Sequence, residues 1–260
     1  MFMRDRKDPS KAGSGRTPSP VSRRAFLQRL AAGGAAFAAA PFALAPSREG
    51  GSLRGAFPGR RALDLGSRQE VQLFNGRDLS GWEFFLDEDG ARMEDVWSVE
   101  DGILACTGDP RGYLYTEEAY ESFRLVVEWR WPGEPGNSGV LLRVTPEAVM
   151  LPNCVEAQLR SGSAGDMYGF QGFRIGGDPE RLSEISIGWS LSKIQGNENP
   201  PGEWNRYEIT ADGDRITLYL NGTRVNEATG CEVRPGRIGL QSEGGVIHFR
   251  TVSLLPLGVS

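Results

Sequence analysis

Phe123-Arg124-Leu125-Val126-Val127-Glu128-Trp129-Arg130-Trp131 is the stretch on which the fold prediction rests. Large apolar residues occupy every odd-numbered position from 123 to 131, whereas three of the four even-numbered positions carry a charge. Successive side chains of a β-strand point to opposite faces of its sheet, so one face of this strand is wholly apolar. Such a face must be buried against a second layer of structure.

Short strand candidates separated by turn signals lie on both sides of this stretch. Asp101-Gly102 joins residues 96–99 to residues 103–106, and Asn221-Gly222 joins residues 214–220 to residues 223–225. Both dipeptides are typical of tight hairpins. No convincing amphipathic helix follows residue 70, although residues 117–121 have room for one helical turn. Strands recurring about every 8–12 residues with Gly-rich turns predict an all-β sandwich of two sheets.

A second alternating stretch, Cys154-Val155-Glu156-Ala157-Gln158-Leu159-Arg160, carries the candidate site. Glu156 and Gln158 would stand on its polar face, about 7 Å apart along the strand. Arg143 occupies the polar face of the preceding strand candidate, so we expect it beside them. A carboxylate, an amide and a guanidinium on one sheet face can bind a polyhydroxylated ligand. The alternative is that this face is simply the solvated side of a half-buried strand.

Residues 161–201 do not fit a simple succession of strands. They are rich in Gly, Ser and Asp and contain scattered aromatic residues, including Tyr168. Long loops within compact domains are often functional. Because this segment follows Glu156 and Gln158 directly, it is a candidate to cover whatever they bind.

Residues 1–45 resemble an export signal. Arg23-Arg24 follows a basic segment and resembles a twin-arginine motif, an apolar run spans residues 30–40, and Ala43-Leu44-Ala45 resembles a cleavage site. The apolar run is too short to span a bilayer, although an uncleaved anchor is the alternative. We therefore expect a periplasmic or extracellular protein, with a linker over residues 46–70 and one domain over residues 71–258.

The charge of the chain argues against nucleic acid and anionic lipid as partners, and its cysteines argue against a metal or redox site. Residues 1–45 hold eight Lys or Arg and two acidic residues, so the remainder has a formal net charge of −11. Such a surface repels nucleic acid and lacks the basic clusters that attract anionic lipid. Cys106, Cys154 and Cys231 match no metal or redox motif, and a chain of this length needs no disulfides to stabilise its core.

His248 is the only histidine, which excludes a His-rich zinc or di-iron centre and weakens a Ser-His-Asp triad. We expect it to be structural. Ordinary glycoside hydrolysis requires two carboxyl groups about 5–10 Å apart. Glu156 has an amide, not an acid, as its neighbour on the same face, so Asp166 and Glu243 are the candidates for a second carboxylate.

Eight short motifs follow one another from about residue 72 to residue 255. They are Leu73-Phe74-Asn75-Gly76-Arg77-Asp78-Leu79-Ser80-Gly81-Trp82, Trp97-x-Val99-Glu100-Asp101-Gly102, Gly136-Asn137-Ser138-Gly139, Glu156-x-Gln158, Gly165-Asp166, Pro201-Gly202-Glu203-Trp204-Asn205, Leu220-Asn221-Gly222 and Ile238-Gly239-Leu240-Gln241-Ser242-Glu243-Gly244-Gly245-x-Ile247-x-Phe249-Arg250. In this order they resemble the 3-keto-disaccharide hydrolase family. One departure is His248, which stands where many relatives carry another residue.

The resemblance implies a concanavalin A-like jelly-roll sandwich whose concave sheet binds saccharide. It also implies hydrolysis of glycosides already oxidised to a ketone at carbon 3 of the sugar. Such a ketone acidifies the proton on carbon 2, so one carboxylate base can start elimination of the aglycone, after which water adds back. This route requires a base and an electrophile to stabilise the enolate oxygen, not a pair of carboxylates.

The candidate residues for this chemistry come from the motifs and from the strand and loop positions described above. Glu156 and Glu243 are the candidate catalytic bases, and Arg143 is one candidate electrophile. The other is an oxygen-ligated divalent cation such as Ca²⁺, held by Glu156, Asp166 and Glu243. The candidate substrate-binding residues are Asn137, Arg143, Gln158, Asp166, Tyr168 and Gln241.

Two other functions remain open at this point. A lectin-like module would present the same concave sheet to a saccharide without turning it over. A conventional endoglucanase of the same fold would require a second acid close to Glu156 and would act on unoxidised glucans.

Overall fold

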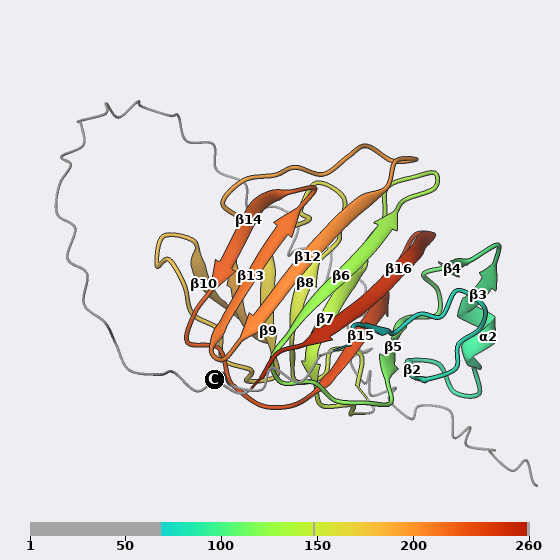
Figure 1. Cartoon of the computed structure of the whole chain (residues 1–260), viewed down its shortest axis with the longest axis horizontal. Coiled ribbons are helices and arrows are strands. Elements are labelled where there is room, and N and C mark those ends of the chain that lie inside the picture. Colours follow the sequence, from blue (N-terminus) through green and yellow to red (C-terminus); the bar gives the residue numbers. More distant parts are fainter. Residues whose placement is uncertain (1–68, 148, 259–260) are drawn as a thin grey trace, which may run out of the picture. The chain divides into compact units, whose positions relative to one another are not determined.

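The structure is a computed structural model that describes residues 69–147 and 149–258. The expected export signal over residues 1–45, and nearly all of the expected linker over residues 46–70, lie outside these residues. The described part of the chain is almost entirely β-structure arranged as two antiparallel sheets (Figure 1). None of its helices is long and apolar enough to cross a membrane.

Sheet A contains eight strands in the spatial order β14-β13-β12-β6-β16-β4-β3, with β1 also paired to β16. Their bounds are β1 Val71–Gln72, β3 Trp97–Glu100, β4 Ile103–Cys106, β6 Phe123–Arg130, β12 Asn205–Asp212, β13 Arg215–Leu220, β14 Thr223–Ala228 and β16 Ile247–Pro256. The short helix α2 (Met93–Val96) precedes β3.

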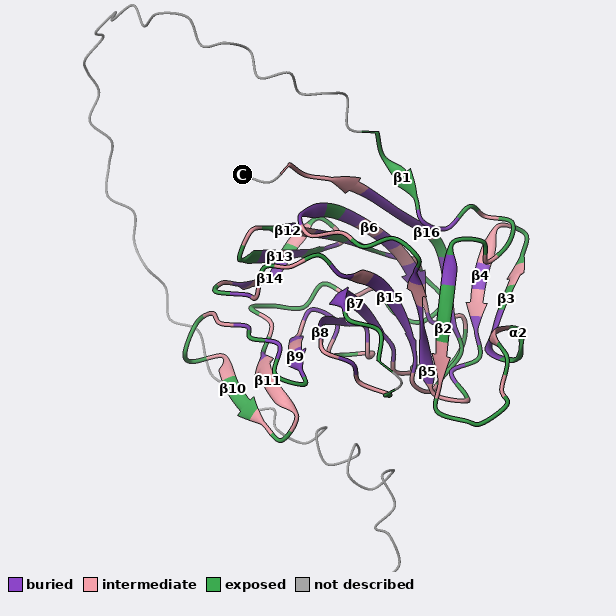
Figure 2. Ribbon diagram, turned by 90° about the horizontal axis from the view of Figure 1, so that it is seen from below, coloured by how far each residue is buried: buried purple, intermediate pink, exposed green. Residues whose placement is uncertain are grey.

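Sheet B also contains eight strands, in the order β10-β11-β9-β8-β7-β15-β5-β2. Their bounds are β2 Trp82–Leu86, β5 Gly112–Thr116, β7 Gly139–Val144, β8 Cys154–Gln158, β9 Met167–Phe170, β10 Leu182–Ile185, β11 Gly188–Leu191 and β15 Arg237–Ser242. In Figure 2 this sheet forms an arc from β10 and β11 through β8 and β7 to β5 and β2, and its concave face is turned away from sheet A.

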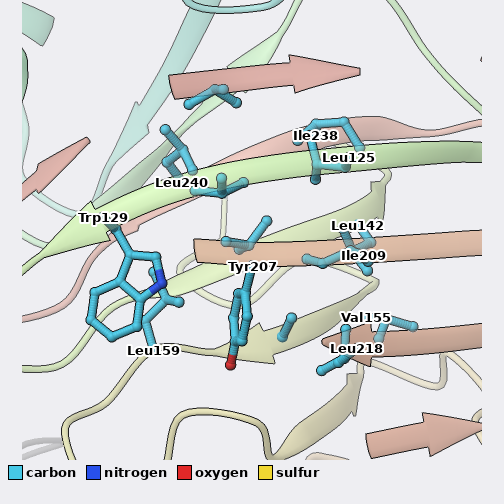
Figure 3. Close-up of a cluster of buried hydrophobic side chains, with 14 of the residues drawn as sticks. Leu125, Trp129, Leu142, Val155, Leu159, Tyr207, Ile209, Leu218, Ile238 and Leu240 are labelled. Atoms are coloured by element: carbon cyan, nitrogen blue, oxygen red, sulfur yellow. The ribbon is translucent and has the colours of Figure 1, made fainter. Parts of the chain in front are cut away.

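The core lies between the two sheets, as the alternation of β6 predicts. Figure 3 shows Leu125 and Trp129 of β6 in one buried apolar cluster with residues of sheet B such as Ile238 and Leu240. Trp129 packs edge-on against Tyr207, with ring centroids 6.3 Å apart. Each large apolar side chain buried in this way contributes about 1.5–3 kcal/mol. The Tyr207 hydroxyl donates a 2.6 Å hydrogen bond to the backbone carbonyl of Gln158, so the core also links sheet A to the strand that carries Glu156.

The two predicted hairpins are confirmed. Asp101 and Gly102 have φ of 52° and 76°, and Asn221 and Gly222 have φ of 50° and 78°. Two consecutive positive φ angles are characteristic of the turns that match the twist of antiparallel strands. The helical turn considered near residues 117–121 is absent, because Tyr120 instead pairs with Gly236 through two backbone hydrogen bonds of 2.8 and 3.1 Å.

Residues 161–201 are not an irregular loop, although Ile185 and Ile187 of this segment do pack over part of the concave face. Strands β9, β10 and β11 form within this segment and extend sheet B. The chain then runs along the edge of sheet A, where the Ile194 amide donates to the Val225 carbonyl at 2.7 Å and the Asn197 side chain donates to the Leu220 carbonyl at 3.1 Å. The segment therefore enlarges the concave sheet and fastens it to sheet A.

Candidate active site

The register of β8 places Glu156 and Gln158 on the concave face of sheet B. Val155, Ala157 and Leu159, which alternate with them, belong to the core between the sheets. Glu156 lies opposite Leu141 of β7 and Tyr168 of β9, and Gln158 lies opposite Gly139 of β7. The predicted placement of these two polar side chains on one face is confirmed.

Gly139 makes room for the carboxylate of Glu156. A Cβ atom at position 139 would lie 2.2 Å from Glu156 Oε1 and 2.7 Å from Gln241 Oε1. Both side chains therefore extend over the glycine from the neighbouring strands β8 and β15. A glycine inside a strand often marks such a close approach.

Asn137 and the turn after β15 bring Glu243 to the same region. The Asn137 side-chain amide donates to Glu243 Oε2 at 2.8 Å, and the Asn137 backbone amide donates to the Gly244 carbonyl at 2.7 Å. A Cβ atom at Gly136 would lie only 2.7 Å from the Gly244 carbonyl oxygen. The absence of a side chain at Gly136 thus allows the turn that carries Glu243 to pack against the start of β7.

Several buried polar atoms at this site have no hydrogen-bond partner. They are Glu156 Oε1, Asn137 Oδ1, and both Oε1 and Nε2 of Gln241. Glu156 and Gln241 are 2% and 0% exposed. Buried polar groups in folded proteins are nearly always satisfied, so unpartnered atoms gathered at one site indicate that a polar ligand completes their bonding. This feature is what distinguishes the concave face from an ordinary solvated sheet face.

The carboxyl groups of the site influence one another. Burial raises the pKa of Glu156 well above its usual value, and the negative charges of Glu243 and Asp166 raise it further. Burial also raises the pKa of Glu243 to about 6, although the positive charges of Arg111 and Arg160 oppose this shift. Two nearby carboxyl groups cannot both ionise easily, so the pair retains a proton to a higher pH than isolated glutamates.

Residues 69–255 match the 3-keto-α-glucoside-1,2-lyase-like domain family. The chain belongs to this family. A proposed glycosyl hydrolase from Parabacteroides distasonis has a similar structure, with a TM-score of 0.54 and 21% identity over 74% of this chain and 96% of that protein. A second from the same species gives a TM-score of 0.53 and 24% identity over 73% and 100%.

A prokaryotic β-1,3-1,4-glucanase (lichenase) derived from a mouse hindgut metagenome has a TM-score of 0.50 and 13% identity, over 73% of this chain and 99% of that protein. At these identities the likeness shows the shared fold, so the jelly-roll prediction is confirmed. No curated protein sequence matches the chain. Family and fold together indicate carbohydrate processing or binding of the glycosidase type.

The side chain of Arg143 does not reach the concave face, so the prediction that it lies beside Glu156 is wrong. Strand β7 has a β-bulge where it pairs with β15: Arg237 lies opposite Val144 and Gly239 lies opposite Leu141, so β7 has one extra residue here. Arg143 lies in this bulge and has a φ of 53°. Such a bulge re-aims a side chain. The buried guanidinium donates instead to the backbone carbonyls of Glu121, Glu232 and Gly213, at 2.9, 2.6 and 2.7 Å.

The remaining predicted residues lie near the concave face but differ in how much of their bonding is used. Gln158 Oε1 accepts a hydrogen bond from the Arg160 backbone amide at 2.7 Å, and Asp166 Oδ1 accepts one from the Lys193 backbone amide at 2.8 Å. Tyr168 stacks on Phe170, with ring centroids 5.8 Å apart and planes inclined by 11°. Within residues 69–147 and 149–258, no three His, Cys, Asp or Glu side chains gather in a way that could hold a metal ion.

Beside Glu156 lies an apolar cluster that the sequence did not reveal. Its buried members are Tyr113, Leu141, Val144, Cys154 and Phe170. Leu151, Ile185 and Ile187 pack on it, so the 145–153 loop and the turn between β10 and β11 cover this part of the concave face. Apolar side chains therefore border the polar region of the concave face that contains Glu156, and they lower the local dielectric constant there. Cys154 contributes to this cluster by packing, and all three cysteines are buried and free.

His248 lies away from this site. It pairs with Arg130 on sheet A, and its neighbour Phe249 points into the core, so its side chain is on the outer face of that sheet. Its Nδ1 atom lies 3.4 Å from Arg130 Nη2. This position agrees with the structural role expected from the sequence.

Proposed function

We propose that this protein cleaves 3-keto-glycosides by elimination, with Glu156 as the base, and that water then adds to the product to complete hydrolysis. The observation that supports this most strongly is the buried Glu156 carboxylate, whose Oε1 has no partner and which lies beside the unpartnered amide of Gln241. The family description names the same class of reaction on 3-keto-α-glucosides.

The reaction balances with the groups available. The Glu156 carboxylate takes the proton from carbon 2, and the electrons of that C–H bond form the enolate of the carbon 3 ketone. The carbonyl then re-forms as a double bond between carbons 1 and 2 forms and the bond from carbon 1 to the aglycone oxygen breaks. The departing oxygen takes a proton from the carboxyl group of Glu243. Water then adds across the new double bond and gives the free 3-keto sugar.

The two carboxyl groups retain a proton between them to a higher pH than isolated glutamates, so one can act as the base while the other supplies a proton. A base is more effective when its pKa lies close to the working pH, and burial moves Glu156 in that direction. The pKa of about 6 keeps a larger fraction of Glu243 protonated near neutrality than the usual glutamate value would. Asn137 and Gln241 then bind sugar hydroxyls through atoms that are free in the protein.

A second candidate function is ordinary glycoside hydrolysis with two carboxyl groups. It is favoured by one observation, which is that Glu243 lies close enough to Glu156 to raise its pKa. This mechanism acts on unoxidised sugars and does not require a ketone at carbon 3. A non-catalytic saccharide-binding module would use the same side chains and release no product.

The test compares a chromogenic 3-keto-α-glucoside with its unoxidised counterpart, each with Ca²⁺ and with a chelator so that a cation-assisted route is also detected. Our proposal predicts release from the 3-keto substrate alone, and Glu156→Gln should abolish release while retaining substrate binding, because the amide preserves shape but is not basic. Release from the unoxidised glucoside would favour the two-carboxylate mechanism. Binding of both sugars without release from either would favour the binding module.

A further inference from the structure

Removal of Arg143 from the site leaves the proposed reaction without one of the two electrophiles expected from the sequence. Two other arginines are close enough to Glu243 to influence its pKa: Arg111, which precedes β5, and Arg160, which follows β8. Among the residues that the structure describes, neither guanidinium has a hydrogen-bond or ion-pair partner, although most arginines of sheet A do. An unpaired cation beside buried carboxylates is available to a ligand.

The backbone fixes the direction of Arg160. Leu159 is buried in the core between the sheets, and its amide donates to the Ser138 carbonyl at 2.9 Å, so pairing with the chain before β7 continues beyond the end of β8. The next side chain, that of Arg160, is therefore directed to the concave side. Its amide is held by Gln158 Oε1 at 2.7 Å, and its carbonyl accepts from the Ser163 amide at 2.8 Å.

The charge of Arg160 influences the pKa of one residue on each side of Glu156. It opposes the rise that burial causes in the pKa of Glu243, which follows β15, and in the pKa of Tyr168, which lies on β9. Tyr168 is directly opposite Glu156 in the strand register, whereas Glu243 approaches from the other side of β7. Glu243 and Tyr168 lie on opposite sides of Glu156, so a side chain directed to the concave side just after β8 is placed between them. Arg111 influences Glu243 but is not among the charges that affect Tyr168.

We propose that the Arg160 guanidinium binds the ketone oxygen on carbon 3 and stabilises the negative charge that this oxygen acquires when Glu156 takes the proton from carbon 2. This role rests on the proposed function. The electrons of the carbon 2–hydrogen bond move into a double bond between carbons 2 and 3, and the carbonyl pair moves onto the oxygen. When the bond from carbon 1 to the aglycone breaks, the carbonyl re-forms and the charge on the oxygen disappears.

The chemistry of the side chain suits this role. A guanidinium presents several N–H donors in one plane and remains charged throughout the working pH range. The buried surroundings of Glu156 and the apolar cluster beside it lower the local dielectric, which strengthens the attraction between the cation and a developing oxyanion. Gln158, through its bond to the Arg160 backbone, is then a positioning residue.

The test is Arg160→Ala, assayed on the chromogenic 3-keto-α-glucoside with and without added guanidinium chloride at concentrations below those that unfold the protein. We expect kcat to fall by about 10²–10³-fold, as for loss of one donor to an oxyanion, with little change in KM. Free guanidinium should restore part of kcat, because it can occupy the space that the side chain leaves. Arg160→Lys should retain more activity than Arg160→Ala.

Arg111→Ala is the matched control, since it removes an unpaired guanidinium that also acts on Glu243. Its activity should not respond to guanidinium chloride, and thermal melting establishes that each variant is folded. An Arg160→Ala variant with the kcat of the wild type would overturn the assignment. So would a folded, impaired Arg160→Ala variant that guanidinium does not restore. A wild type inactive on every 3-keto-glucoside would instead overturn the proposed function, and this role with it.

Discussion

Replacing Gly139 by Ala tests whether Glu156 lies where the structure places it. The new Cβ would be 2.2 Å from Glu156 Oε1, so the carboxylate must move by more than about 1 Å to reach ordinary van der Waals separation. A displacement of this size at a reacting group can lower the rate by about 10²-fold. Overpacking of a buried site costs about 1–3 kcal/mol, and the gain from replacing a strand glycine by alanine offsets about 0.5–1 kcal/mol of it.

We therefore expect Gly139→Ala to unfold with a free energy about 1–2 kcal/mol below that of the wild type and to lose most of its kcat. Urea unfolding and the 3-keto-glucoside assay measure the two effects. Gly133→Ala is the control, because Gly133 is exposed, does not have a positive φ, and has nothing within 4 Å of its added Cβ. If Gly139→Ala behaved like this control in both measurements, the Glu156 side chain would not lie over Gly139.

Three further predictions concern other parts of the chain. Arg143→Met should lower the free energy of unfolding by about 2–4 kcal/mol, because it removes three hydrogen bonds from a buried guanidinium, and its folded form should keep the kcat of the wild type. The pKa of Glu156 is raised in the fold, so the folded protein binds more protons than the unfolded chain above the usual glutamate pKa. The free energy of unfolding should consequently fall as the pH rises from the usual glutamate pKa through the raised pKa of Glu156. Urea unfolding at a series of pH values should show a weaker fall for Glu156→Gln. Equal dependence on pH in the wild type and the variant would contradict the raised pKa. Replacing Arg23 and Arg24 by Lys should retain the protein in the cytoplasm on cell fractionation, whereas unchanged export would exclude a twin-arginine signal.

Local periodicity was sufficient to predict much of the fold. The apolar positions of residues 123–131 can be buried only if the strand packs on another layer, and the paired turn residues at 101–102 and 221–222 set the hairpins. The same alternation placed Glu156 and Gln158 on one face. These predictions succeeded because they depend on neighbours within a few residues.

Arg143 shows where such reasoning fails. Its strand accommodates one extra residue against β15, and the residue at the positive φ is an arginine, not the glycine or asparagine that usually indicates this conformation. The meeting of Asn137 with Glu243 depends on the pairing of β7 with β15, which lie about 100 residues apart in sequence. Periodicity contains no information about such pairings, so the sequence offered Glu243 as a candidate carboxylate but not its contact with Asn137.

The most direct test of the proposed mechanism is the rate of aglycone release from a 3-keto-α-glucoside carrying deuterium on carbon 2. If Glu156 removes the hydrogen from carbon 2, kcat/KM for the deuterated substrate should show a primary isotope effect relative to the protiated one. Hydrolysis by displacement at carbon 1 leaves the carbon 2–hydrogen bond intact. Equal rates of release from the two substrates would contradict elimination and the role of Glu156 as its base.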